Sequence, residues 1–318
     1  MTFIELRKDK PSGFGKNPND RTALELLQYG IVIIDKPSGP TSHQVSAYVK
    51  GMLHLKKTGH SGTLDPKVTG VLPVALGRGT RIVSALLPQG KEYIALMHLH
   101  ADVPRGTLIK AFNDYIGKIK QMPPVKSAVK RQWRERSIYE LELIDIVGQD
   151  ALFRTSVEAG TYIRKLIHDL GQTLGCGAHM AELRRTRAGP FTEDQSHAMQ
   201  DLADAYYYFK QEKKDEPLKK LILPVETAVV NMQKVWVLDS TVDSLCHGAT
   251  LKLPGIAKIT DKIAFDTPIA VMTLKEELIG LGKAKMSTTD MQKYPTGVAV
   301  KLEHVFMMPG TYPKMDKQ

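Results

Sequence analysis

From residue 29 onward, the order of apolar and polar positions predicts a chain that mixes strands and helices. Short apolar runs, each followed by turn residues, indicate buried strands. The predicted strands are residues 31–34, 93–100 and 152–157. A helix is expected directly after Thr41, because Thr41 and Gln44 have the spacing of a capping box and apolar residues follow at helical intervals.

Two later segments also predict helices. The first has Thr161 as its N-cap and an apolar stripe that ends before Gly175, and the second covers residues 201–212. After Asn231 the pattern changes to short β segments separated by glycines, which is typical of a small β-barrel. The expected fold class is therefore α+β, with a mixed-sheet domain followed by a C-terminal small β-barrel.

Composition divides the chain further. Residues 1–28 are polar and rich in turn-forming residues, so this segment forms no domain by itself and is ordered only where other elements hold it. The expected parts are an N-terminal extension (1–28), a mixed α and β domain (29–231), a small β domain (235–305) and a C-terminal tail (306–318).

The charge of the chain points to a polyanionic partner. Among its 318 residues, 44 Lys and Arg outnumber 34 Asp and Glu, which gives a formal net charge of +10. Basic side chains favour nucleic acid, because neutralised phosphates release condensed counterions. Cys176 and Cys246 have no metal or CxxC spacing, and no apolar run is long enough to cross a membrane. We therefore expect a cytoplasmic protein that binds nucleic acid.

Residues 59–73 hold the densest group of special residues. Glycines and prolines surround Asp65, a single carboxylate between apolar neighbours, which predicts a tight loop that presents this side chain. Taken alone, the Asp65-Pro66 dipeptide is more often a turn than a catalytic site. The scattered histidines have no Cys or carboxylate partner at zinc spacing, so no metal site is expected.

Four parts of the chain resemble the TruB-like pseudouridine synthases and, within them, the archaeal dyskerin-type catalytic subunit of H/ACA guide-RNA particles. These parts are Asp35–His43, His60–Pro73, Lys91–Tyr93, and Gly160–Arg164 together with Ala178–Arg187. The region from Val235 to Val305 resembles a PUA domain in residues 247–249, 254–256 and 280–284. The resemblance implies that residues 29–231 form the catalytic domain.

The resemblance also implies a reaction, the isomerisation of specific uridines in RNA to pseudouridine. The bond between C1′ and N1 breaks, the uracil turns, and C1′ bonds to C5, so no cofactor or metal is required. Asp65 matches the catalytic carboxylate of the family, which acts as nucleophile or as base; which of the two stays open. Arg164 matches its charged partner, and Lys36 and Pro37 match a motif that supports the catalytic loop.

Other residues match positions that bind the substrate uridine after it has flipped out of the RNA. Tyr93 matches the residue that stacks on the uracil, and Tyr162 and Leu183 match residues that line the pocket. His60 matches the residue that supports the flipped conformation. Without the resemblance, Tyr93, Tyr162 and Leu183 would be assigned to the hydrophobic core.

A basic cluster follows the two prolines at 123 and 124. Its members are Lys126, Lys130, Arg131, Arg134 and Arg136, around Trp133. The prolines indicate a projecting loop, and cations beside an aromatic ring suit phosphate binding and base stacking, although a solvated face is the alternative. In the family this region resembles a thumb loop over the RNA. Arg184 belongs to a second cluster, which either binds RNA or pairs with local carboxylates.

The resemblance implies three partners: H/ACA guide RNA, a substrate rRNA or tRNA, and small H/ACA core proteins. The PUA region is expected to hold the guide RNA. Two alternatives remain, a guide-independent tRNA pseudouridine synthase and a non-catalytic RNA-binding scaffold. The presence of Asp65, Tyr93 and Arg164 argues against the scaffold, and the dyskerin-like segments favour guide dependence.

Overall fold

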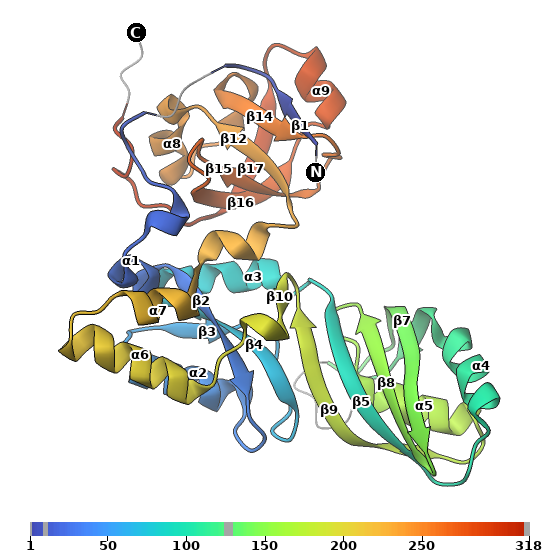
Figure 1. Cartoon of the computed structure of the whole chain (residues 1–318). Helices are drawn as coiled ribbons and strands as arrows, with labels where there is room; N and C mark the ends of the chain where they lie inside the picture. The colour runs from blue at the N-terminus through green and yellow to red at the C-terminus, as the bar shows by residue number, and fades with distance from the viewer. Residues whose placement is uncertain (1, 9–11, 124–129, 315–318) are drawn as a thin grey trace. The chain divides into compact units, whose positions relative to one another are not determined.

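The computed structural model describes residues 2–8, 12–123 and 130–314. Its contacts divide the chain into two compact units (Figure 1). We call residues 32–75 with 82–221 the sheet unit, and residues 1–31, 76–81 and 222–318 the terminal unit. Both units combine helices with mixed sheets, which confirms the α+β class.

The helices of the sheet unit are α2 (Ser42–Met52), α3 (Val83–Leu86), α4 (Arg105–Tyr115), α5 (Ile163–Thr173), α6 (Met199–Gln211) and α7 (Glu216–Leu221), with the 3-10 helix η3 (Glu193–Gln195). Its strands, counting two that extend into residues of the terminal unit, are β2 (Gly30–Lys36), β3 (Thr58–His60), β4 (Thr69–Leu76), β5 (Lys91–Leu99), β6 (Gly117–Gln121), β7 (Arg134–Val147), β8 (Asp150–Val157), β9 (Ala178–Ala188) and β10 (Phe191–Thr192).

These strands form one mixed sheet. Its order is β11-β2-β4-β9-β5-β8-β7-β6, where β11 is Ile222–Pro224, and β3 and β10 pair with β4 and β9. β4 and β9 run parallel, whereas the neighbours from β9 to β6 pair antiparallel. The strands predicted at 31–34, 93–100 and 152–157 correspond to β2, β5 and β8, so these predictions are confirmed.

The two predicted helix starts have different outcomes. Thr41 Oγ1 accepts a hydrogen bond from Gln44 N at 3.1 Å, and Thr41 N donates to Gln44 Oε1 at 2.8 Å, which confirms the capping box of α2. The choice of Thr161 as the cap of α5 is wrong, because Tyr162 is the N-cap. The Thr161 hydroxyl instead donates to Glu158 O at 2.8 Å within the preceding turn.

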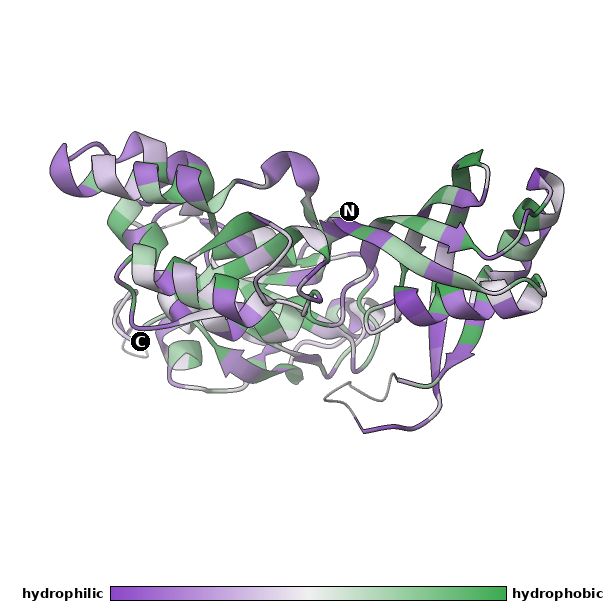
Figure 2. Cartoon of the chain, turned by 90° about the horizontal axis from the view of Figure 1, so that it is seen from below, coloured by the Kyte–Doolittle hydropathy of each residue, from purple (hydrophilic) through white to green (hydrophobic). Residues whose placement is uncertain are grey.

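The core of the sheet unit lies between the sheet and two helices. Along β5, every second residue from Lys91 to Leu99 is buried. In Figure 2, the strands at the right carry both hydrophobic (green) and hydrophilic (purple) residues. α4 contacts β7, α5 contacts β9, and the two helices contact each other, so both cover the same face. Because the apolar side chains of each strand are buried on this face, the side chains between them point to the opposite face of the sheet.

In the terminal unit, the helices are α1 (Ala23–Gln28), α8 (Asp239–Cys246) and α9 (Thr288–Lys293), with the 3-10 helices η1 (Pro18–Asp20), η2 (Gly77–Ile82), η4 (Val225–Val229) and η5 (Leu253–Gly255). The strands are β1 (Phe3–Glu5), β12 (Gln233–Val237), β13 (Leu251–Lys252), β14 (Ile256–Thr260), β15 (Pro268–Met272), β16 (Leu278–Ala284) and β17 (Val298–Val305). Their order in the sheet is β1-β14-β12-β15-β16-β17-β13.

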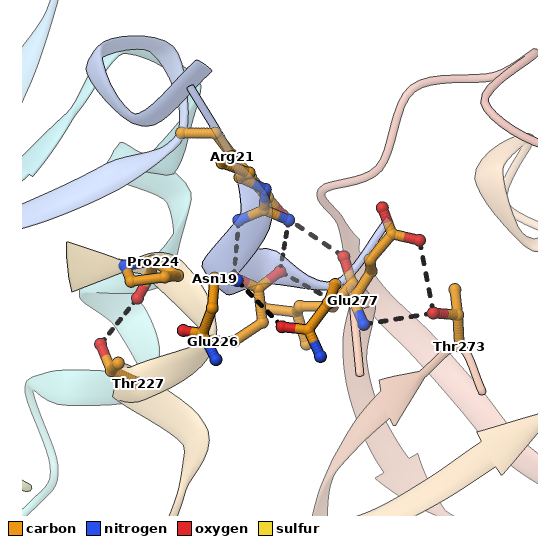
Figure 3. A network of polar contacts seen from close by, with 10 residues as sticks. Asn19, Arg21, Pro224, Glu226, Thr227, Thr273 and Glu277 are labelled. Carbon is orange, nitrogen blue, oxygen red and sulfur yellow. Dashed lines mark hydrogen bonds and ion pairs between the residues drawn. The ribbon is translucent and has the colours of Figure 1, made fainter. Parts of the chain in front are cut away.

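The first residues of the chain are fastened to this unit. β1 pairs antiparallel with β14. Arg21 donates two hydrogen bonds to the Glu226 carboxylate, at 2.7 and 2.8 Å, and Glu226 also accepts from Leu278 N at 3.0 Å (Figure 3). Burial opposes the charge of Arg21, but the hydrogen bond and the charge of Glu226 outweigh it and raise the Arg21 pKa. The partner strand of β1 therefore lies after Asn231 in the chain.

Candidate active site

Asp65 lies on a tight turn between β3 and β4. Its carbonyl accepts a hydrogen bond from Val68 N at 3.0 Å, and Pro66 occupies the second position, where its fixed φ suits a turn. Lys36, the last residue of β2, is fully buried and donates to the carbonyl oxygens of Pro37 (2.8 Å), Pro66 (2.9 Å) and Val68 (2.8 Å). One buried ammonium group therefore binds two carbonyl groups of this turn and holds them next to the end of β2.

Two buried cations lie beside the Asp65 loop. Burial lowers the pKa of Lys36, the charge of Arg185 lowers it further, and the attraction of Asp65 opposes both effects. Arg185 in β9 is only 1% exposed; its Nε donates to Val71 O at 2.8 Å and its Nη2 to Gly62 O at 3.3 Å. Both cations act on carbonyl groups of the loop region, which holds its backbone in one conformation.

Arg164 reaches the Asp65 carboxylate from α5. Its Nη2 donates to Asp65 Oδ2 at 2.5 Å, and the two side chains are 59% and 53% exposed. The start of α5 is fixed by Gln121 of β6, whose amide accepts from Tyr162 N at 3.0 Å and donates to Tyr162 O at 3.2 Å. Because the carboxylate is half exposed, Arg164 serves to orient Asp65 more than to offset a cost of burial.

Tyr93 and Leu183 belong to the same hydrophobic cluster as the residues around Asp65. Leu64 and Val68 are buried in this cluster with Tyr93, which is 9% exposed, and Leu183 packs against it. Tyr93 lies opposite Arg185 in the β5–β9 ladder. Burial lowers the Arg185 pKa, and the electrostatic attraction of Tyr93 partly offsets this effect. The structure thus gathers Tyr93, Leu183 and the Asp65 loop around one core.

The close approach of β4 and β9 depends on Gly70. Its φ is +100°, and a Cβ atom at this position would lie 2.2 Å from Arg185 O. Only glycine accepts both the dihedral angle and this distance. Gly70 therefore lets the strand that follows the Asp65 loop lie directly beside the strand that carries Arg185.

Sequence analysis did not identify three residues that support the site. Ser42 Oγ donates to Leu64 O at 3.1 Å and accepts from Leu64 N at 2.8 Å, so this buried side chain holds the residue before Asp65. The other two are Gln121 and Arg185. In the sequence, Arg185 cannot be told apart from the neighbouring cations of its segment. Each acts on the backbone of a segment distant along the chain, and no local pattern signals such a contact.

His60 ends β3 and is half-buried. Its Nδ1 is buried and has no hydrogen-bond partner in the described parts of the chain. Burial lowers the pKa of His60, and the positive charges of His43 and Arg185 lower it further. The ring is therefore predominantly neutral near pH 7 in the free protein.

The basic cluster divides into free and engaged side chains. Lys126 lies outside the described residues. Lys130 and Arg131 are exposed, beside Trp133, which is 65% exposed, and they form no ion pair with any residue that the structure describes. Arg136 instead forms an ion pair with Glu158 at 3.6 Å. Arg134, from the same cluster, is half-buried and donates to Lys130 O at 3.4 Å.

Arg184 is held by two carboxylates. Its Nη1 and Nη2 donate to the two oxygens of Asp35, both at 3.0 Å, and the guanidinium also pairs with Glu193. The hydrogen bond to Asp35 is the main reason why the Arg184 pKa is raised. Of the two roles left open for this residue, the structure shows the pairing with local carboxylates, and a contact with RNA stays a prediction.

Lys91 supplies a prediction on stability. Its Nζ donates to Leu87 O (2.8 Å) and Gln89 O (2.6 Å), and burial, with the charge of Arg185, lowers its pKa to about 8. Between pH 8 and the ordinary value of 10.5, the unfolded chain keeps a proton that the folded chain has lost, so stability rises with pH there. We expect wild type to gain about 3 kcal/mol over this window, and Lys91→Met to lack that gain.

Urea unfolding at several pH values from 7.5 to 10.5 measures this difference. Lys118→Met, which removes an exposed ammonium group from β6, is the matched control and should keep the wild-type pH dependence. Equal pH dependence in wild type and Lys91→Met would contradict the prediction.

Two further observations concern only the described residues. Within residues 2–8, 12–123 and 130–314, no helix has both the length and the apolar composition needed to cross a membrane. The same residues contain no group of three or more His, Cys, Asp or Glu side chains arranged to hold a metal ion.

Four family models match the chain in succession. Residues 50–163 match the N-terminal domain of TruB family pseudouridylate synthases, and residues 164–230 match the C-terminal domain of tRNA pseudouridylate synthase B. Residues 233–306 match the PUA domain and residues 4–46 the DKCLD (NUC011) domain.

Curated relatives match over nearly their full length. The probable tRNA pseudouridine synthase B of Pyrococcus abyssi is 53% identical over 300 residues, which cover 94% of this chain and 90% of the relative. The protein of the same name from Methanothermobacter thermautotrophicus is 48% identical over 314 residues, which cover 98% of this chain and 97% of the relative.

Solved structures agree with these relatives. A chain in the crystal structure of a Cbf5-Nop10-Gar1 complex matches with a TM-score of 0.95 and 49% identity, covering 99% of this chain and 96% of the other. A chain in the structure of an H/ACA RNP bound to a substrate RNA containing 2′-deoxyuridine matches with a TM-score of 0.93 and 47% identity, covering 98% and 96%. The chain belongs to the TruB family of pseudouridine synthases.

Proposed function

We propose that the chain converts uridine to pseudouridine with Asp65 as the catalytic carboxylate, inside a guide-RNA particle. The observation that carries the proposal is the pairing of Asp65 with Arg164 at 2.5 Å, on a turn braced by buried Lys36. The carboxylate is half exposed, so a flipped nucleotide can reach it, and Arg164 orients it.

The reaction is an isomerisation, so every atom of the uridine is retained apart from exchangeable protons. The C1′–N1 bond breaks, the uracil turns, the C1′–C5 bond forms, and the proton on C5 leaves while N1 gains one. Asp65 either attacks C1′ and forms an ester with the ribose, which breaks when C5 bonds to C1′, or removes the proton from C2′ to give a glycal and returns it to C2′ when C5 adds to C1′. In both routes its carboxylate must be held toward the ribose, and the hydrogen bond from Arg164 supports this orientation.

The neighbouring side chains suit the uridine. Tyr93, packed in the hydrophobic cluster opposite buried Arg185, offers a ring for stacking, and Leu183 packs against the same cluster. Tyr162 adjoins Arg164 at the start of α5. His60 supports the RNA beside the flipped nucleotide.

We further propose that the chain acts with an H/ACA guide RNA and small core proteins of the Nop10 and Gar1 type, on rRNA and also on tRNA. The structures of a Cbf5-Nop10-Gar1 complex and of an H/ACA RNP with substrate RNA support this assembly. Residues 235–305, within the terminal unit, hold the guide RNA in this proposal. The free thiols Cys176 and Cys246 agree with a reducing, cytoplasmic location.

A reconstitution with three RNA arms tests the proposal. Purified full-length chain, with the two small proteins, is mixed with an rRNA fragment and a matching guide RNA, with the fragment alone, or with tRNA alone. We expect pseudouridine only at the guide-paired uridine in the first arm and none in the second. Pseudouridine in the tRNA arm, together with none in the arm that contains the rRNA fragment and its guide, would favour the guide-independent synthase, as the names of the relatives suggest.

The exposed part of the basic cluster should act through phosphates. Replacing Lys130 and Arg131 by Ala is expected to weaken binding to RNAs of different sequence alike and to lower the slope of log affinity against log salt by roughly one unit per lost contact. Filter binding at several salt concentrations measures the slope. Arg105→Ala with Lys110→Ala removes the same charge from the exposed face of α4 and should leave the slope near wild type.

If the Lys130 and Arg131 variant has the wild-type slope, these cations are a solvated face with no contact to RNA.

A further inference from the structure

A pocket of about 360 Å³ lies beside His60, between α2 and β3. Its lining residues are His43, Ser46, Ala47, Lys50, Thr58, Gly59 and His60. Protein sites for small ligands have volumes of roughly 300 to 1,000 Å³, so this pocket has room for one small group rather than a large ligand. Apart from His60, the lining residues are absent from the assignments of the catalytic site.

The chemistry of the lining favours an anion. His43, Lys50 and His60 are basic, and no lining residue is acidic. The two hydroxyl groups have already used their protons, because Ser46 Oγ donates to Thr58 Oγ1 at 3.1 Å and Thr58 Oγ1 donates to Ser46 O at 2.9 Å. The side-chain donors that remain for a ligand are therefore the three basic groups.

These basic groups have no internal partner. His43 and Lys50 are exposed, and their side chains form no ion pair or hydrogen bond with the described residues. His60 Nδ1 is buried and unpaired. A neutral histidine ring has one nitrogen that donates and one that accepts, so Nε2 of His60 can donate to a ligand while Nδ1 keeps its lone pair.

We propose that this pocket binds one backbone phosphate of the substrate RNA strand, next to the target uridine. The position supports this source, because His60 lies five residues before Asp65 on the segment that leads into the catalytic turn. The inference rests on the proposed function, since it assumes that the uridine is bound at Asp65. A phosphate held by Lys50, His43 and His60 fixes the strand beside the flipped nucleotide and sets its register.

Substrate RNAs with a single neutral methylphosphonate linkage test the proposal. The linkage is moved one position at a time around the target uridine, and the affinity of the full chain, assembled with guide RNA, is measured for each RNA. For wild type, one linkage near the target should reduce affinity about tenfold, the effect of losing a hydrogen bond between charged groups. For Lys50→Gln, the same linkage should change affinity less than about twofold, because the contact is already absent.

Two further variants sharpen the comparison. Lys56→Gln removes an exposed ammonium group four residues beyond α2 and outside the pocket lining, and it should keep the wild-type sensitivity at that linkage. His43→Gln should lose the sensitivity as Lys50→Gln does, and it replaces Lys50→Gln if that variant does not fold. If both pocket variants keep the wild-type profile, or if no linkage in the substrate RNA reduces the affinity of wild type, the proposal is wrong.

The readout separates this proposal from the proposed function, because affinity is measured without any chemical step. If the sensitivity to one linkage disappears in Lys50→Gln, in a protein that forms no pseudouridine, the phosphate site is supported and the assignment of the reaction to Asp65 is overturned. If the protein forms pseudouridine but no linkage reduces its affinity, the phosphate site is overturned and the assignment of the reaction to Asp65 is supported.

Discussion

Replacement of Asp65 by Asn is expected to abolish pseudouridine formation while the affinity for RNA stays within about threefold of wild type. Asn has nearly the shape of Asp but neither its charge nor its basicity, so both candidate roles of the carboxylate are lost. The turn should persist, because its hydrogen bond joins backbone atoms of Asp65 and Val68, and Lys36 binds only carbonyl groups. The rate of the chemical step should fall by at least about 10⁴-fold.

A single-turnover assay with saturating enzyme and assembled guide RNA measures that step. Asp102→Asn removes an exposed carboxylate from the same unit, after β5, and is the matched control that should retain the wild-type rate. A near wild-type rate in Asp65→Asn would remove the basis for this active site and would favour the RNA-binding scaffold.

Replacement of Arg164 by Ala is expected to cost activity heavily and stability little. The loss of activity, about 10²-fold or more, follows because the Asp65 carboxylate is no longer oriented toward the ribose. Since the two side chains are 59% and 53% exposed, solvent screens the pair and its removal should change the free energy of unfolding by no more than about 1 kcal/mol.

The chain offers a matched control for this variant. Arg154 in β8 pairs with Glu142 in β7 at 2.7 Å, with exposures of 45% and 60%, close to those of the Arg164–Asp65 pair. Arg154→Ala should therefore change stability by a similar small amount and leave activity unchanged. Arg164→Lys keeps the charge without the planar fork and should have intermediate activity. Equal activity of Arg164→Ala and Arg154→Ala would contradict the orienting role.

Local patterns in the sequence were sufficient for elements whose stabilising contacts are close along the chain. The strands β2, β5 and β8 follow from apolar runs, and the start of α2 follows from Thr41 and Gln44, which are three residues apart. The predicted start of α5 was wrong by one residue. The Thr161 hydroxyl donates a hydrogen bond to Glu158 O in the preceding turn, and Tyr162 is the N-cap. Local signals therefore predict an element more reliably than its end.

Motif resemblance added Asp65, Arg164, Tyr93 and Leu183 to the candidate site, but it gave no geometry. Arg164 and Asp65 are 99 residues apart, and only the packing of α5 against the sheet, with Gln121 holding its first residue, brings their side chains to 2.5 Å. The same holds for Arg184, because its two carboxylate partners, Asp35 and Glu193, lie on other segments of the chain.

The sequence by itself determined the order of the elements, the net charge and the identity of the candidate carboxylate. Only the tertiary structure decided which cations are buried and which are free. Lys36 and Arg185 are buried beside the Asp65 loop, where they donate hydrogen bonds to carbonyl groups, while Lys50 and Lys130 are exposed. The reason is physical: the burial of a charged group depends on hydrogen-bond partners from distant segments, and these partners exist only once the sheet has formed.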